Sequence, residues 1–164
     1  MTERLIILPP EYKETPQPVI FLAGPIQGAA DWQSEAIDII NQLNPDIIVA
    51  SPRRSAFCES LNFDEQVDWE THFLDRAGKN GVVLFWLARE QESMPGRAYA
   101  QTTRAELFEW KEKHLTRGAK LALGIEEGFT GSRYIRRRFG QECPEITICT
   151  SLEETCRSAL AQIS

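Results

Sequence analysis

The sequence lacks any apolar run of about 20 residues, the length that a helix needs to cross a bilayer. Prolines soon interrupt the short segment that follows residues 1–4, so we do not expect a signal peptide. Cysteine is scarce, and the four cysteines form no CxxC pair and have no histidine at metal-ligand spacing. These absences predict a cytoplasmic protein with reduced thiols, no membrane contact and no bound metal.

Basic residues are too few to balance the acidic ones, and the formal net charge is -6. This excess argues against binding to polymeric nucleic acid, whereas a small nucleotide needs only a local basic group. Neither a GxGxxG segment nor a Walker lysine is present, and no repeat or linker divides the chain. We expect an extended, proline-rich N-terminal lead-in at residues 1–17 and a single folded domain at 18–164.

Apolar strands alternate with amphipathic helices along the chain. Strands are predicted at 19–23, 47–50, 82–87, 121–125 and 146–149, and 5–8 is a candidate for a short edge strand. Helices are predicted at 31–43, 62–77, 102–115, 132–139 and 151–163. This alternation predicts an α/β fold with a flavodoxin-like or Rossmann-like sheet, five-stranded and largely parallel, with helices on both faces. Spacing alone leaves the strand order open.

The strand at 82–87, the loop at 89–101 and the following helix form the predicted floor of an active site. Ligands of open α/β sheets bind beyond the carboxyl ends of the strands. Glu106 falls in the first turn of the predicted helix, where the helix dipole stabilises a carboxylate, so we interpret it as a nucleophile. Alternatively, Glu106 bonds back to the backbone of Thr103 in a capping box. The loop is longer than the roughly 2–6 residues usual in such connections, which favours a binding site.

Glu70 is the second candidate for a catalytic carboxylate. It follows Val67 by three residues and precedes Leu74 by four, so it points toward the apolar side of its helix. A carboxylate in that position needs a partner or a chemical task. Two carboxylates beside one cleft suit glycosyl chemistry, in which one attacks the anomeric carbon and the other assists the leaving group.

The remaining candidates each have an ordinary structural alternative. The glycines of loop 24–28 either let the backbone approach a ligand or form a tight turn. Arg53 and Arg54 either steer a polar ligand or make a solvated corner. His72 is interpreted as a surface histidine. Four aromatic side chains either stack on a flat base or pack in the core: Phe21, Trp69, Trp86 and Tyr99.

Four stretches of the chain, taken in order, match a known pattern. They are FLAGPI at 21–26, VDWE at 67–70, VLFW at 83–86 and TTRAE at 102–106. Together they resemble the nucleoside 2-deoxyribosyltransferase-like family over about residues 18–125, and FLAGPI and TTRAE are the most specific of them. The resemblance implies a flavodoxin-like fold and a homo-oligomer. It also implies cleavage of the N-glycosidic bond of a deoxynucleoside or nucleotide, whose sugar passes to another base or to water.

The resemblance also implies roles for individual residues. The family's glutamate nucleophile matches Glu106, and no metal or organic cofactor is expected to assist it. Arg104 is expected to hold Glu106 ionised or to contact an anionic group of the substrate. Trp86 is expected to contact the base. The family's first sugar- or base-contacting loop matches Gly24, Pro25, Ile26 and Gln27.

The group that assists the leaving base is expected on the helix before the central strand. Glu70 and Asp75 lie near the position of an aspartate in the better-studied transferases, and the loop before Glu106 offers Glu90 and Glu92 but no aspartate. The leading hypothesis is therefore an enzyme that acts on a small nucleoside or nucleotide. The alternatives are a non-catalytic nucleotide-sensing module that uses the same cleft, and a structural domain in which Glu106 only caps its helix.

Overall fold

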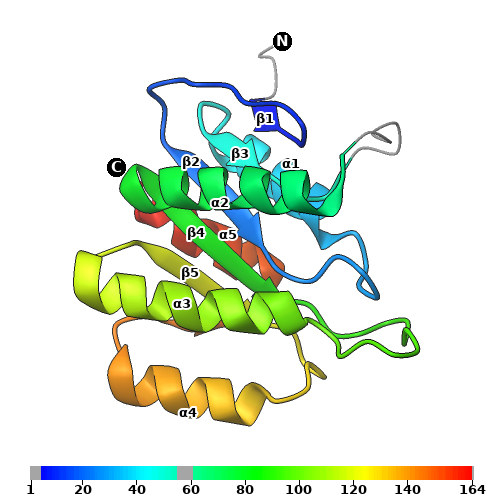
Figure 1. The fold of residues 1–164 in the computed structure, drawn as a ribbon. Coiled ribbons are helices and arrows are strands. Elements are labelled where there is room, and N and C mark those ends of the chain that lie inside the picture. Colours follow the sequence, from blue (N-terminus) through cyan, green and yellow to red (C-terminus); the bar gives the residue numbers. More distant parts are fainter. Residues whose placement is uncertain (1–4, 55–60, 164) are drawn as a thin grey trace.

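The computed structural model describes residues 5–54 and 61–163. Within these ranges, six strands form a parallel sheet in the order β1-β3-β2-β4-β5-β6 (Figure 1). The strands are β1 (Ile6–Ile7), β2 (Val19–Ala23), β3 (Ile48–Ala50), β4 (Gly81–Leu87), β5 (Leu121–Ile125) and β6 (Ile148–Cys149). The helices are α1 (Trp32–Leu43), α2 (Phe63–Lys79), α3 (Gln101–Arg117), α4 (Ser132–Glu142) and α5 (Leu152–Ala161).

The predicted α/β fold with a parallel sheet is confirmed. From β3 to β6 the strand order is the flavodoxin-like one, which spacing left open. The number of strands was predicted as five, but β1 adds a sixth at the edge, where Ile6 and Ile7 pair with Val49 and Ala50 of β3. The strand predicted at 146–149 is shorter than expected, because only Ile148–Cys149 pairs with β5.

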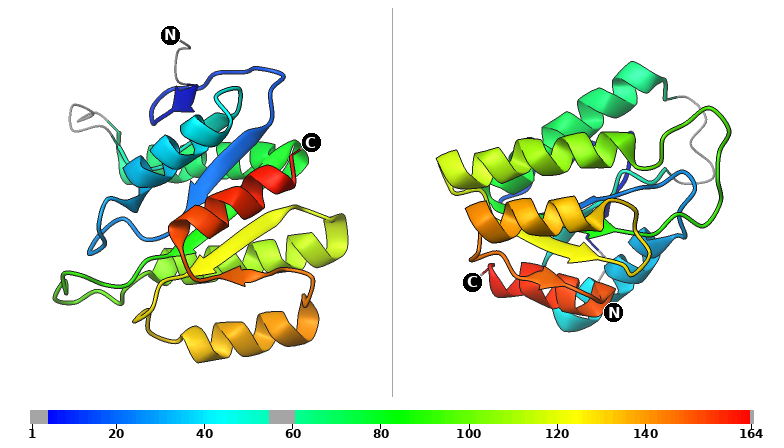
Figure 2. Two further views of the ribbon diagram at one scale, coloured as in Figure 1. Left: turned by 180° about the vertical axis from the view of Figure 1, so that it is seen from behind. Right: turned by 90° about the horizontal axis from the view of Figure 1, so that it is seen from below.

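Helices cover both faces of the sheet. Figure 1 shows α2, α3 and α4 in front of it, and the left view of Figure 2 shows α1 and α5 on the other side. Alternate residues of β2 point to opposite layers: Phe21 packs with α2 and α3, whereas Ile20 and Leu22 pack with α1. Such a strand has no polar face, which explains why the strands read as continuous apolar runs.

Polar side chains begin three of the helices, as the sequence predicts. Asp31 accepts a hydrogen bond from the backbone N–H of Ser34 at 3.2 Å, and Asn62 does the same for α2 at 2.9 Å. Ser151 caps α5 through the N–H of Glu154 at 3.1 Å. At its other end, α2 stops at Lys79, and the C-cap N–H of Asn80 donates to the carbonyl of Arg76. Among the described helices, none combines the length and apolarity that crossing a membrane would require.

Three of the four cysteines lie within the described residues. Cys143, Cys149 and Cys156 carry free thiols in the structure, in agreement with the expected reduced state. Cys58 lies outside the described residues. Residues 1–4 also lie outside them, so the structure does not bear on the expected absence of a signal peptide.

Candidate active site

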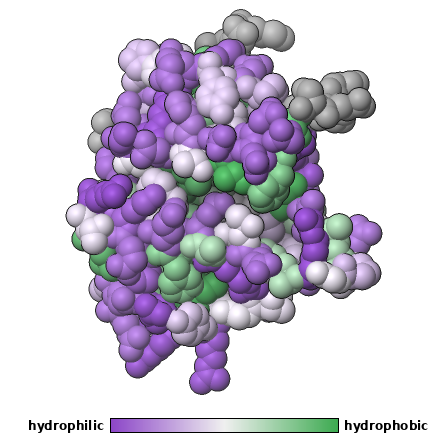
Figure 3. Space-filling view, viewed as in Figure 1, coloured by the Kyte–Doolittle hydropathy of each residue, from purple (hydrophilic) through white to green (hydrophobic). Residues whose placement is uncertain are grey.

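A cavity of about 400 Å³ opens at the carboxyl ends of β2 and β4. These neighbouring strands form the switch point of the sheet, because the chain continues from them to opposite sides, and ligands of doubly wound folds bind at such points. Figure 3 shows hydrophobic surface on the same side of the molecule, beside the first half of α2, where Phe63 is 79% exposed. The cavity is lined by the loop after β2, the first half of α2, the loop after β4 and the start of α3.

Glu106 lines this cavity from the second turn of α3. The helix begins at Gln101, and its N-cap residue is Ala100 in the left-handed conformation, with no side-chain capping bond. Thr103 therefore lies inside the helix and is 6% exposed, so the predicted capping box is wrong. The prediction that Glu106 lies in the first turn is wrong for the same reason. In the part of the chain that the structure describes, the Glu106 carboxyl makes no hydrogen bond or ion pair.

The environment of Glu106 favours its protonated form. Burial raises the pKa of Glu106 to about 8, and repulsion from Glu70 and then from Glu109 adds to this effect. Among the described residues, no donor or cation offsets the loss of water at Glu106, so the carboxyl is more stable with its proton bound. Perturbed carboxyls of this kind are concentrated at functional sites.

Glu70 faces the same cavity but has polar partners. Gln66 donates from Nε2 to Oε1 of Glu70 at 3.0 Å and to the carbonyl of Pro52, also at 3.0 Å. Arg54 in turn donates from Nε to Oε1 of Gln66 at 2.8 Å. Burial raises the pKa of Glu70, while the bond from Gln66 and the charge of Arg54 act in the opposite direction. The two carboxyls therefore differ in their surroundings, because Glu70 accepts a hydrogen bond from Gln66 and lies near the charge of Arg54.

The two arginines that follow β3 separate in the structure. Arg54 lines the cavity, as the ligand-steering interpretation requires. Arg53 instead contacts α1 and the residues before it, with its Nε 3.2 Å from Oδ1 of Asp31 and 3.0 Å from Oε1 of Gln33. His72 lies elsewhere on α2, where it bonds with Glu14 at 3.1 Å.

All four residues of the predicted contact loop line the cavity: Gly24, Pro25, Ile26 and Gln27. Gly24 is needed for close packing here, because a Cβ at this position would lie 2.4 Å from the carbonyl oxygen of Trp86. The same Cβ would lie 2.5 Å from the indole of Trp32, whose Nε1 donates to the carbonyl of Pro25 at 2.9 Å. The two interpretations of this loop are therefore compatible, because the loop makes a tight turn at Gly24 and also lines the cavity.

The structure does not bring Trp86 or Arg104 into the cavity. Trp86 is 5% exposed and packs with α1 and α5, because its neighbours Phe85 and Leu87 take the face that leads to the cavity layer. Arg104 lies two residues before Glu106, which places it on a different side of the helix. It donates to Oγ1 of Thr130 at 3.0 Å and stacks 4.3 Å from the ring centroid of Phe129. Neither residue lines the cavity, so the expected contact of Trp86 with the base gains no support, and neither does the expectation that Arg104 holds Glu106 ionised or contacts an anionic group.

Some of the other predicted site residues line the cavity and some do not. Glu90 and Glu92 line the cavity, whereas Asp75 bonds with Lys79 at 2.8 Å on the exposed side of α2. Among the aromatic candidates, Tyr99 and Phe21 line the cavity, and Trp69 is fully buried.

Sequence reasoning missed Gln66, the residue that joins Arg54 to Glu70. It lies one helical turn before Glu70, and this i, i+4 spacing on a common helix face was the signal that pointed to it. It also missed the cavity-lining residues Met94 and Arg97, for which the only signal was the length of the loop after β4.

The family model described as nucleoside 2-deoxyribosyltransferase like matches residues 17–117. The chain belongs to this family. Every residue that lines the cavity lies within the matched segment of this nucleoside 2-deoxyribosyltransferase-like protein, from Phe21 to Glu106. The chain beyond residue 117 completes the sheet with β5 and β6 and covers it with α4 and α5. A search of curated proteins returns no match to the chain.

Proposed function

We propose that this protein cleaves the N-glycosidic bond of a nucleoside or nucleotide, with Glu106 as the nucleophile. The observation that carries the proposal is a carboxyl that has no partner among residues 5–54 and 61–163, next to a second carboxyl, in a cavity at the carboxyl ends of β2 and β4. Membership of the nucleoside 2-deoxyribosyltransferase-like family supports the same reaction class. No residue of this mechanism requires a metal or an organic cofactor.

In the first step, an oxygen of ionised Glu106 forms a bond to C1′ of the sugar while the bond from C1′ to the base nitrogen breaks. The base nitrogen takes the electron pair and a proton from solvent, which we expect to reach it through a water molecule bound to Glu70. In the second step, a nitrogen of another base or a water oxygen attacks C1′, loses its proton and releases Glu106. Positive charge develops on the sugar in both steps, and the neighbouring carboxylates stabilise it.

The raised pKa of Glu106 fits a nucleophile that burial keeps poorly solvated. At neutral pH the proton on Glu106 must leave before attack, so the reaction rate is expected to rise with pH toward the pKa of about 8. Arg54 and Arg97 line the same cavity and offer positive charge to a nucleotide phosphate. Comparing nucleosides with their monophosphates therefore tests which of the two classes is the substrate.

The decisive experiment incubates the purified protein with a panel of nucleosides, deoxynucleosides and their monophosphates, with and without a free acceptor base. Base release and base exchange are followed by liquid chromatography. A nucleoside with fluorine at C2′ of its sugar should leave that sugar attached to Glu106, because such a sugar ester hydrolyses slowly. Mass spectrometry should then show the added sugar mass on the wild type and not on Glu106→Gln. Glu127→Gln, which changes an exposed glutamate outside the cavity, is the matched control.

We expect turnover of at least one substrate by the wild type and by Glu127→Gln, and a loss of at least 1,000-fold, about 4 kcal/mol of transition-state stabilisation, in Glu106→Gln. Glu70→Gln should retain a fraction of the activity. Folded protein that neither releases nor exchanges a base across the panel contradicts the proposal. Thermal stabilisation by the same ligands without turnover, unchanged in Glu106→Gln, would support the binding-only alternative instead.

A further inference from the structure

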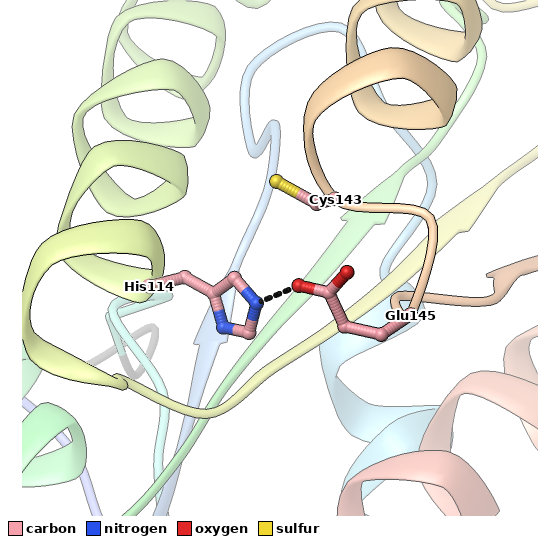
Figure 4. A group of neighbouring side chains, drawn as sticks. All are labelled: His114, Cys143 and Glu145. Carbon is pink, nitrogen blue, oxygen red and sulfur yellow. Dashed lines mark hydrogen bonds and ion pairs between the residues drawn. The ribbon is translucent and has the colours of Figure 1, made fainter.

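Three side chains with metal-binding atoms meet far from the cavity, at the other end of α3. They are His114 in the last turn of α3, Cys143 at the end of α4, and Glu145 in the connection to β6. One ligand atom from each lies within 4.8 Å of the others. Figure 4 shows the imidazole and the carboxylate pointing toward one another, with the sulfur of Cys143 beside the pair.

The hydrogen bonds of His114 orient its ring for this cluster. Its Nδ1 lies 2.8 Å from the carbonyl oxygen of Ala119, which can only accept, so Nδ1 carries a proton. Its Nε2 lies 2.6 Å from Oε1 of Glu145, inside the cluster. Metal-bound histidines usually have this arrangement, in which one ring nitrogen donates to a carbonyl and the other is directed at the metal.

The local charges also favour a cation. His114 lies in the last turn of α3 and Cys143 is the C-cap residue of α4, so the negative ends of two helix dipoles converge there. Lys111 brings a positive charge near Cys143, but this charge is offset by Glu112 at 2.9 Å and Glu142 at 3.1 Å. Cys143 is fully buried, whereas the Glu145 side chain is 56% exposed and gives access from solvent.

We propose that His114, Cys143 and Glu145 bind a zinc ion, with water as the fourth ligand. Nitrogen, thiolate sulfur and carboxylate oxygen are the donor atoms that Zn²⁺ prefers, at bond lengths of about 2.0–2.3 Å. Ligand atoms around such an ion lie about 3 to 4 Å apart, so the three side chains have to adjust by up to roughly 1 Å. Zinc replaces the thiol proton of Cys143 and any proton shared between Nε2 of His114 and Glu145, and these protons pass to solvent.

Zinc at this position would join the end of α3 to the α4–β6 connection. His114 follows Glu106 by eight residues on the same helix, a separation of about 12 Å along its axis, so zinc would not contact a substrate in the cavity. The expected role of the zinc ion is structural. The zinc proposal does not depend on whether the protein cleaves a glycosidic bond. No spacing in the sequence indicates this site, because His114 and Cys143 are far apart in the chain.

The test is a cobalt titration of the reduced, metal-free wild-type protein, followed by absorption spectroscopy. We expect a near-ultraviolet thiolate-to-cobalt band that saturates at one equivalent and disappears when Zn²⁺ is added. Zn²⁺ should also raise the melting temperature. Cys143→Ser should lose the band, and Glu145→Gln should weaken binding at least tenfold. Cys149→Ser, which changes a buried cysteine outside the cluster, should behave like the wild type.

Three results would overturn the zinc site. They are a folded wild type without the cobalt–thiolate band, a band that persists in Cys143→Ser, and a Zn²⁺ affinity that is unchanged in Glu145→Gln. The last of these remains decisive if Cys143→Ser fails to fold, because the Glu145 side chain is exposed and its substitution spares the core.

Discussion

Replacing Glu106 by glutamine should change how the stability of the protein depends on pH. Burial is the largest cause that raises the pKa of Glu106 to about 8, from an ordinary value of 4.5. The folded protein therefore binds this proton more tightly than the unfolded chain does. The stabilising effect is fully present below pH 4.5, where both states are protonated, and is lost as the pH rises to about 8.

The size of the effect follows from the separation of the two pKa values. Each pH unit between them lowers the free energy of unfolding by about 1.4 kcal/mol, so the loss between pH 4.5 and 8 is about 5 kcal/mol. Glutamine has nearly the same shape and does not titrate, so Glu106→Gln lacks this loss. The change from carboxyl to amide also alters the free energy of unfolding by an amount that does not depend on pH. The quantity to compare is therefore the slope of the free energy of unfolding against pH.

Urea unfolding at pH 5, 6, 7, 8 and 9 measures this slope for the wild type, Glu106→Gln and the control Glu127→Gln. The stability of Glu106→Gln relative to the wild type should increase steadily up to pH 8 and then level off. Glu127 is exposed, so the control should follow the wild type at every pH. A difference between Glu106→Gln and the wild type that stays constant from pH 5 to 9 would refute the burial and repulsion argued for Glu106.

Four further substitutions test the cavity and the helices. Glu70→Gln removes a repulsive charge, so the pKa of Glu106 should fall below about 8, as a carbon-13 titration of the carboxyl would show. Gly24→Ala places a Cβ 2.4 Å from a β4 carbonyl and should lower the unfolding free energy by about 3 kcal/mol. By contrast, Gly140→Ala meets nothing within 4 Å inside α4 and should raise the same quantity by about 0.5–1 kcal/mol. Asn62→Ala removes the α2 cap and should lower the urea midpoint through a loss of about 1 kcal/mol.

The fold was largely predictable because its signals are local. Buried parallel strands must be apolar on both faces, and capping side chains such as Asp31 must lie within three residues of the N–H groups that they bind. The start of α3 was the exception among these signals. Thr103 resembles a cap, but the helix begins earlier, at Gln101, after a residue in the left-handed conformation that no local pattern announced.

The candidate site was predictable in part. Glu106, Glu70 and loop 24–27 meet because they all lie at or beyond the carboxyl ends of strands, and the parallel sheet gathers those ends at one edge. Trp86 was misplaced because the alternation along β4 decides which layer each side chain enters, and a uniformly apolar strand does not show which face is which. The pKa of Glu106 depends on its burial and on its distance to Glu70, which are properties of the packed molecule.

Periodicity, caps and turn residues thus determined the class of the fold and the edge of the sheet where chemistry was to be sought, since each acts over a few residues. Packing decided the rest. Segments that are distant in sequence must come together to set the strand order, to raise the pKa of Glu106 and to bring His114 close to Cys143. A local sequence pattern does not determine which distant segments pack together.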